Sequence, residues 1–189
     1  MINRTTALEI VQEFVKNPNL IRHMLAVEAA MQFYAERLDP EGVEKWRVVG
    51  LLHDFDWEIH PTLEEHPQAG VPILKERGVS DDIIRAIQSH ADHTGVPRES
   101  DLEKALYACD EITGLITAVA LVRPSRSLHD LTVKSVKKKW KDKAFAAGAN
   151  RDEIESGAAA FGLPLWEHVE NVIEAMRRVS ADLGLDNRD

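Results

Sequence analysis

The sequence contains a single cysteine, Cys109, so the chain has no partner for an internal disulfide and its fold does not depend on an oxidising compartment. It has no uninterrupted apolar run close to the ~20 residues that span a bilayer. Its first residues lack the basic-then-apolar pattern of a secretory signal. These absences lead us to expect a cytoplasmic location and no membrane partner.

Basic residues are in deficit, with 23 Lys and Arg against 32 Asp and Glu, which gives a formal net charge of −9. Phosphate backbones favour a surplus of positive charge, so the balance argues against an extended nucleic acid as partner. The sequence also lacks the GxxxxGK[ST] phosphate loop, the GxGxxG turn and the HExxH zinc helix. These three site classes are therefore excluded.

Helical periodicity dominates what is present, and no pair of alternating strands is visible. The chain of 189 residues has no internal repeat, low-complexity tract or linker, which predicts a single all-α domain over residues 1–189. The segment 56–65 contains Pro61 and is expected to be a loop. Helices are expected at about 5–16, 18–37, 41–55, 67–77, 81–92, 101–122, 128–140, 150–157 and 164–184.

Several ionisable residues fall on apolar faces of these expected helices. His23, His53, His90 and Asp110 each occur at helical spacing among apolar residues, and Asp54 follows His53 directly. A lone histidine on such a face is more often a core residue with a hydrogen-bond partner. Burying several imidazoles beside two carboxylates, however, requires compensation of their charge. A divalent cation provides it, because it accepts imidazole nitrogen and carboxylate oxygen together.

The order of these residues resembles a known family. The apolar stretch 48–52 ends in the dipeptide His53-Asp54, with His23 upstream and Asp110 downstream. This order resembles the HD superfamily of metal-dependent phosphohydrolases, and the segment 135–146 is similar to a small uncharacterised subgroup of HD hydrolases. The resemblance covers residues 18–145. It implies an HD-domain helical bundle with a metal-site core at about 18–123 and a C-terminal helical extension.

The resemblance also implies a ligand set. It makes His23, His53, Asp54 and Asp110 the ligands of one divalent ion. His66 and His90 look like the additional histidines of two-metal branches, with Asp54 bridging both ions. Two-metal members often have a second histidine where this chain has Ala91, which argues against a third ion, and His93 is a weak substitute. The number of ions, one or two, and their identity among Mn, Fe, Ni, Co, Zn and Mg therefore remain open.

The implied reaction is hydrolysis of a phosphoester in a small phosphorylated metabolite or nucleotide by metal-activated water. Asp54 would hold the metal, and Asp56 and Glu58 are the nearest acids for proton transfer, ahead of Asp92. Solvated loop carboxylates are an equally good interpretation of Asp56 and Glu58. Three basic residues are candidates for holding the phosphate, with a solvated surface as the alternative: Lys134, Lys138 and Arg123.

Two other functions are compatible with the same residues. Some HD-fold proteins are di-iron oxygenases with the same ligand pattern, and others are ligand-binding modules without turnover. The sequence does not indicate an oligomeric state. Cys109 is expected to be a buried thiol, whereas His60, His129 and His168 lack companions and are expected at the surface.

Overall fold

The computed structural model describes residues 2–187, and helices are the regular elements of this part of the chain. Its backbone pairing outside helices is limited to an isolated bridge between Ser127 and Asp186, so the all-α prediction is confirmed. Among the described residues, no helix is both long and apolar enough to cross a membrane. The elements are α1 (Arg4–Phe14), α2 (Pro18–Leu38), α3 (Val43–Leu52), η1 (Gln68–Gly70), α4 (Val71–Glu76), α5 (Asp81–Ser89), η2 (Asp92–Thr94), α6 (Asp101–Leu121), α7 (Val133–Trp140), α8 (Arg151–Ala160) and α9 (Leu165–Arg177).

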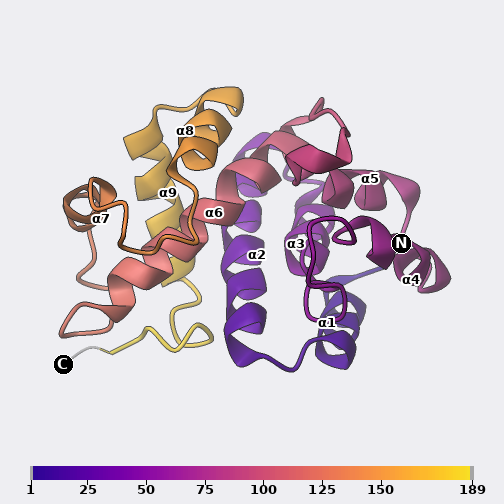
Figure 1. Cartoon of the computed structure of the whole chain (residues 1–189), viewed down its shortest axis with the longest axis horizontal. Helices are drawn as coiled ribbons and strands as arrows, with labels where there is room; N and C mark the ends of the chain where they lie inside the picture. The colour runs from indigo at the N-terminus through magenta and orange to yellow at the C-terminus, as the bar shows by residue number, and fades with distance from the viewer. Residues whose placement is uncertain (1, 188–189) are drawn as a thin grey trace.

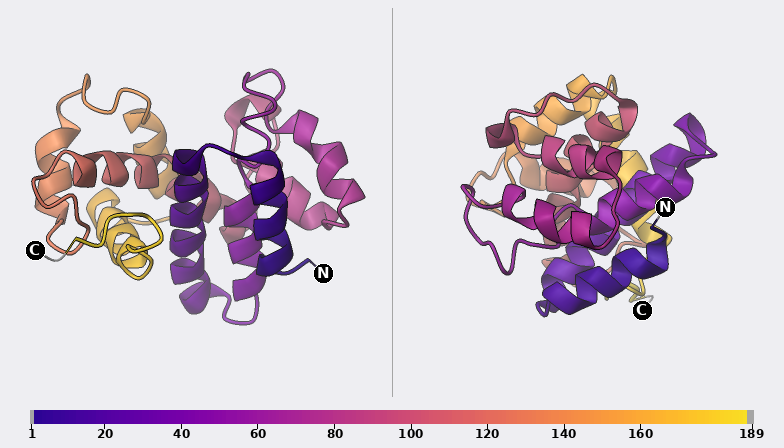
Figure 2. Two further views of the ribbon diagram at one scale, coloured as in Figure 1. Left: turned by 90° about the horizontal axis from the view of Figure 1, so that it is seen from below. Right: turned by 90° about the vertical axis from the view of Figure 1, so that its right-hand side faces the viewer.

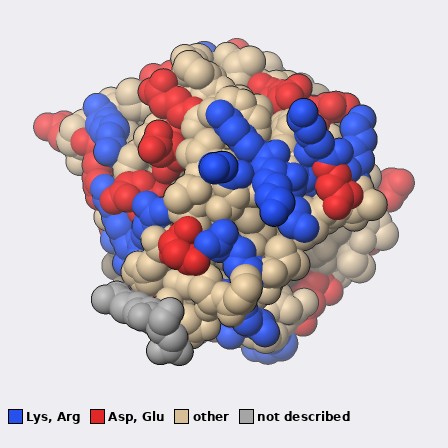
Figure 3. Space-filling view, turned by 90° about the vertical axis from the view of Figure 1, so that its left-hand side faces the viewer, with Lys and Arg blue, Asp and Glu red and all other residues tan. Residues whose placement is uncertain are grey.

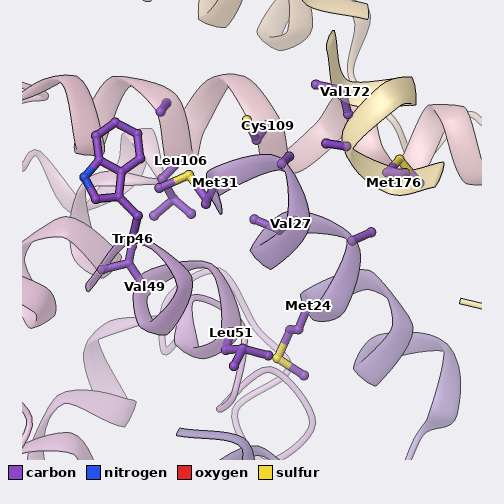
Figure 4. Packing of buried hydrophobic residues seen from close by; sticks show 14 of the residues in the cluster. Met24, Val27, Met31, Trp46, Val49, Leu51, Leu106, Cys109, Val172 and Met176 are labelled. Carbon is purple, nitrogen blue, oxygen red and sulfur yellow. The ribbon is translucent and has the colours of Figure 1, made fainter. Parts of the chain in front are cut away.

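The two longest helices, α2 and α6, occupy the middle of the molecule (Figure 1). Helices α1, α3, α4 and α5 lie on one side of α2, and α7, α8 and α9 lie on the other, as a second direction of view also shows (Figure 2). Helix α2 packs against α3, α6 and α9, while α6 also packs against α8. Side chains from all these helices form one buried core, including Met24, Trp46, Leu106 and Met176 (Figure 4).

The sequence sets the start of each central helix. Asn17 accepts a hydrogen bond from the Asn19 N–H ahead of α2, and Pro18 fills the first helical position, where a missing N–H costs nothing. Ser100 and Glu103 form a reciprocal capping box at the start of α6. These caps fix the register of the two helices that carry His23 and Asp110.

Helices α2 and α3 approach each other closely at Gly50. A Cβ atom at this position would lie 2.9 Å from the Cα atom of Glu28 and 3.2 Å from the Cγ atom of Met31. Real Cβ atoms do not approach backbone this closely, so the contact requires glycine. The contact holds the end of α3, which leads into His53, against the helix that carries His23.

Several predicted helix boundaries differ from the structure by more than two residues. The helix expected at 150–157 continues to Ala160, and the α-helical part of the helix expected at 67–77 begins at Val71. The helices expected at 41–55, 81–92 and 164–184 end at Leu52, Ser89 and Arg177, and the helix expected from 128 begins at Val133. The last difference has a clear cause. The Leu128 N–H donates to the Leu185 carbonyl, and the Arg177 side chain binds the carbonyls of Leu128 and Leu131. These contacts hold the segment in a bent, irregular connection rather than a helix.

His168 is fully buried, so the expectation that it lies at the surface was wrong. Its Nε2–H donates to the Ala108 carbonyl at 2.8 Å, and its Nδ1 lies 2.6 Å from the Tyr34 hydroxyl, which donates to it. The two partners come from α6 and α2, so this histidine links three helices. Burial lowers the pKa of His168 from 6.5 to about 4. Cys109, by contrast, is buried as expected.

The low pKa of His168 predicts a loss of stability in acid. The folded state holds this ring neutral, whereas the unfolded chain takes up a proton below about pH 6.5. Neutral His168 therefore makes its full contribution to the free energy of unfolding above the pKa that it has in the unfolded chain. That contribution declines by about 1.4 kcal/mol per pH unit as the pH falls toward 4. When the pH is lowered from about 7 to about 5, the free energy of unfolding measured in urea should fall by roughly 2 kcal/mol more in the wild type than in His168→Gln. Equal pH dependence in the two proteins would contradict this assignment.

Candidate metal centre

Three side chains from three helical regions meet in a first group: His23 from α2, His53 directly after α3, and Asp110 from α6. The Nε2 atoms of His23 and His53 lie 3.2 Å apart. The Oδ1 atom of Asp110 lies 3.0 Å from the Nε2 atom of His23 and 3.5 Å from that of His53. The three ligand atoms are close enough to contact a single ion.

A second group consists of Asp54, His66 and His90. The Nε2 atoms of His66 and His90 lie 3.2 Å apart. The Oδ1 atom of Asp54 is 3.2 Å from the first of these nitrogens and 3.7 Å from the second. His66 comes from the loop after α3, and His90 comes directly after α5.

Asp54 joins the two groups because its two oxygens face different partners. While Oδ1 faces His66 and His90, Oδ2 lies 3.6 Å from the Nε2 atom of His23 and 3.5 Å from that of His53. This is the arrangement that a carboxylate bridging two cations requires. The structure therefore brings together all six residues that the sequence singled out.

The hydrogen bonds of the rings indicate which nitrogens are available as ligands. The Nδ1 atoms of His53 and His90 lie 2.8 Å and 2.5 Å from the carbonyl oxygens of Gly50 and Ile87. A carbonyl only accepts, so each Nδ1 carries the proton, and the Nε2 atom of the neutral ring presents a lone pair. His66 is fixed in the same way, because its Nδ1 lies 2.8 Å from the Asp56 carboxylate.

This pattern makes the donor set suitable for a divalent ion. The lone pairs of His66 and His90 face each other across 3.2 Å beside a carboxylate oxygen. Such a group of acceptors repel one another unless positive charge lies between them. Imidazole nitrogen combined with carboxylate oxygen suits Mn, Fe, Co, Ni or Zn. The residues present therefore fit the cofactor that the sequence implied.

The electrostatics of the cluster lead to the same conclusion. Burial alone would lower the pKa of His53, but the charge of Asp54 and the bond to Asp110 raise it to about 9. Burial also opposes a similar rise for His66, whose bonds to Asp54 and Asp56 raise its pKa to about 9. In the absence of a cation, protons satisfy the negative charge of the carboxylates. A divalent ion would displace those protons, so binding should weaken as pH falls.

Asp56 and Glu58, the two acids expected to transfer protons, both have hydrogen-bond partners within the protein. Asp56 is fully buried behind His66, where its carboxylate is the partner of that ring, and it does not line the cavity of about 650 Å³ that opens over the two ligand groups. Glu58 is exposed, and one of its oxygens accepts the backbone N–H groups of Lys16 and Asn17 at 2.8 and 2.9 Å. It stabilises the connection between α1 and α2.

Replacing Asp56 with asparagine should weaken one ion more than the other. The amide keeps the shape of the carboxylate but loses its charge, so the His66 ring becomes a poorer donor to a cation. We expect an affinity about 10–100-fold lower for the ion of the Asp54 group and little change for the His23 group. Metal titration followed by calorimetry measures both, with Glu58→Gln as the matched control. Equal weakening of both ions would contradict the assignment.

A cavity of about 650 Å³ opens over the two ligand groups. Glu111, which follows Asp110 on α6, lines it and was missed by the sequence analysis. Burial, followed by the nearby charge of Asp110, raises the pKa of Glu111 to about 7. The side chains that line the cavity are His23, Asp54, Trp57, Leu63, His66, His90, Ala91, Asp92, His93, Asp110, Glu111, Gly114, Ala146, Gly148, Ala149 and Glu153.

The basic residues expected to hold phosphate lie elsewhere. Lys134 and Lys138 are exposed on α7, on the side of the molecule where Lys and Arg side chains gather (Figure 3). Arg123 binds Asp130 at 2.5 Å and Ser135 at 3.0 Å. Within residues 2–187, no lysine or arginine lines the cavity. Lys134, Lys138 and Arg123 therefore do not line the cavity over the metal centre.

Comparison with known proteins agrees with the geometry. Residues 20–115 match the HD domain family. The chain belongs to this HD-domain family. Ribonuclease Y of Nitratidesulfovibrio vulgaris strain DP4 is 33% identical over 97 residues, which cover 51% of this chain and 18% of the relative. Ribonuclease Y of Oleidesulfovibrio alaskensis is 32% identical over 99 residues, again 51% of this chain and 18% of the relative. The chain thus matches only a small part of these relatives, and no solved structure shows a significant match.

Proposed function

We propose that this HD-domain protein is a metal-dependent phosphohydrolase that cleaves a phosphoester in a small phosphorylated metabolite or nucleotide. The observation that carries the proposal is the pair of ligand groups joined by Asp54 at the cavity of about 650 Å³. A cavity of this volume suits a small molecule. The relatives named Ribonuclease Y support the bond type, because cleavage of RNA breaks phosphoester bonds.

The protein side chains would position the ions and the substrate. His23, His53 and Asp110 would hold one divalent ion, and His66 and His90 the other, with Asp54 between them. When bound, such ions polarise phosphoryl oxygens and lower the pKa of bound water toward neutrality. The backbone carbonyls of Gly50 and Ile87 keep the rings of His53 and His90 in the orientation this requires. Phosphoryl transfer then depends mainly on positioning and charge stabilisation.

Glu111 is our candidate for protonating the leaving alkoxide. It lines the cavity, and its Oε2 atom accepts the Asn150 N–H at 2.9 Å. Burial, the first cause of its raised pKa, favours a protonated Oε1. We propose it in place of Asp56 and Glu58, neither of which lines the cavity.

The proposal is tested by assaying phosphate release across a panel of phosphomonoesters and nucleotides after loading with Mn, Fe, Co, Ni, Zn or Mg. Turnover that depends on added metal and disappears with a chelator is the expected result. Uniform absence of turnover with both ions bound would overturn the proposal. Two irons per chain with substrate-dependent oxygen uptake would favour an oxygenase, and tight binding without turnover would favour a ligand-binding module.

A further inference from the structure

The charge of the cavity wall carries a consequence for substrate selection. Beyond the metal ligands, three carboxyl side chains line the cavity: Asp92, Glu111 and Glu153. Asp92 forms an ion pair with Arg98, in which the Arg98 Nη2 atom lies 2.5 Å from the Asp92 Oδ1 atom. Glu111 accepts the backbone N–H of Asn150 through its Oε2 atom and serves as the proposed acid. Glu153 is therefore the carboxylate that adds an uncompensated negative charge to the wall.

Glu153 lines the cavity from helix α8. It lies in the first turn of α8, and the side-chain amide of Asn150 donates to its Oε1 atom at 2.5 Å. Among residues 2–187, its Oε2 atom has no hydrogen-bond or ion-pair partner. Helix α8 packs closely on α6 at Gly157, where a Cβ atom would lie 3.0 Å from the Ala108 Cα atom. The carboxylate is thus held over the cavity by a firmly packed helix.

Charge balance then limits what the cavity accepts, on the assumption that the proposed function holds. Two divalent ions beside the carboxylates of Asp54 and Asp110 leave a surplus of two positive charges. A phosphomonoester dianion neutralises this surplus. Any further negative charge on the substrate would face Glu153 without a lysine or arginine in the described cavity wall to balance it. Removing an anion from water without a partner is unfavourable.

We propose that the site selects phosphomonoesters whose remaining portion is neutral or cationic, and that Glu153 is the residue that determines this specificity. Nucleoside diphosphates and triphosphates, dinucleotides and RNA strands are disfavoured because they carry additional negative charge. The selection works by repulsion of the wrong ligand rather than by extra attraction of the right one. This substrate class differs from the one in the names of the matched ribonucleases.

Calorimetry with two non-hydrolysable probes tests this proposal on the metal-loaded protein. Phenylphosphonate carries only the phosphonate charge, whereas 4-phosphonobenzoate adds a carboxylate to the same ring. We expect the first to bind about tenfold more tightly or better. The preference should fall about fivefold in Glu153→Gln, which keeps the bond from Asn150, and stay unchanged in Glu155→Gln, an exposed neighbour on the same helix.

Kinetics separate this proposal from the proposed function. Phenyl phosphate and 4-carboxyphenyl phosphate are compared as substrates, and the ratio of their kcat/KM values is taken in each variant so that leaving-group effects cancel. Hydrolysis with a ratio that Glu153→Gln leaves unchanged would overturn the specificity proposal alone. Absence of hydrolysis together with the expected calorimetric preference would overturn the reaction and support the charge selection. Equal binding of both phosphonates by the wild type would also overturn the specificity proposal.

Discussion

Replacement of Asp54 by alanine should remove both ions and reduce hydrolysis by about a thousandfold or more. Asp54 is the residue whose two oxygens face both ligand groups, so its loss deprives each ion of a ligand and of a compensating charge. Without Asp54, too little carboxylate charge would remain beside the imidazoles to balance two divalent cations. Elemental analysis of the purified variant gives metal content per chain, and phosphate release gives activity.

A graded comparison makes the Asp54 prediction specific. His66→Ala should lose the ion of its own group and keep the other, because the His23 group remains complete. Asp182→Ala, which changes an exposed aspartate, should retain full metal content. If Asp54→Ala kept the wild-type metal stoichiometry, the bridging assignment would be wrong.

Replacement of Gly50 by alanine should cost about 2–4 kcal/mol of unfolding free energy. The new methyl group would meet the Glu28 backbone at 2.9 Å, and backbone moves less readily than a side-chain end. Separation of α2 from α3 would also carry His53 away from His23, so affinity for the first ion should fall together with stability. Urea unfolding and metal titration measure these two effects.

Gly114→Ala is the matched control for this prediction. Gly114 also lies inside a helix, but a Cβ atom there would meet nothing within 4 Å. Alanine is the better helix former by about 0.5–1 kcal/mol, so this variant should be as stable as the wild type or slightly more so. Comparable destabilisation of both variants would show that the close approach at Gly50 is not the cause.

Most of the ligand cluster could be predicted from the sequence because its members on or next to helices leave a local signal. His23 and Asp110 occupy positions on helices whose apolar spacing fixes which face is buried, and His53-Asp54 ends an apolar stretch. The loop residue His66 carries no such periodicity, and its assignment came from the family resemblance alone. The structure shows it in place, held from behind by Asp56.

The incorrect expectations share a different cause, which is contact between segments distant in sequence. Asp56 was expected to transfer protons or to be a solvated loop carboxylate, because nothing in its neighbourhood shows that His66 folds over it. His168 looked isolated because its partners, Tyr34 and Ala108, are far away along the chain. Glu153 joins the cavity only through the packing of α8 on α6. Spacing within one helix does not report such contacts.

The position of α6 sets a limit on how this protein can be divided. The family match ends at residue 115, inside a helix that continues to Leu121. Helices α8 and α9 cover apolar faces of α6 and α2, and buried residues such as Val172 and Met176 belong to the same core as Met31. A fragment cut at the family boundary would expose these faces to water and lose part of the cavity wall. The buried core of the described residues therefore extends beyond the segment that matches the family.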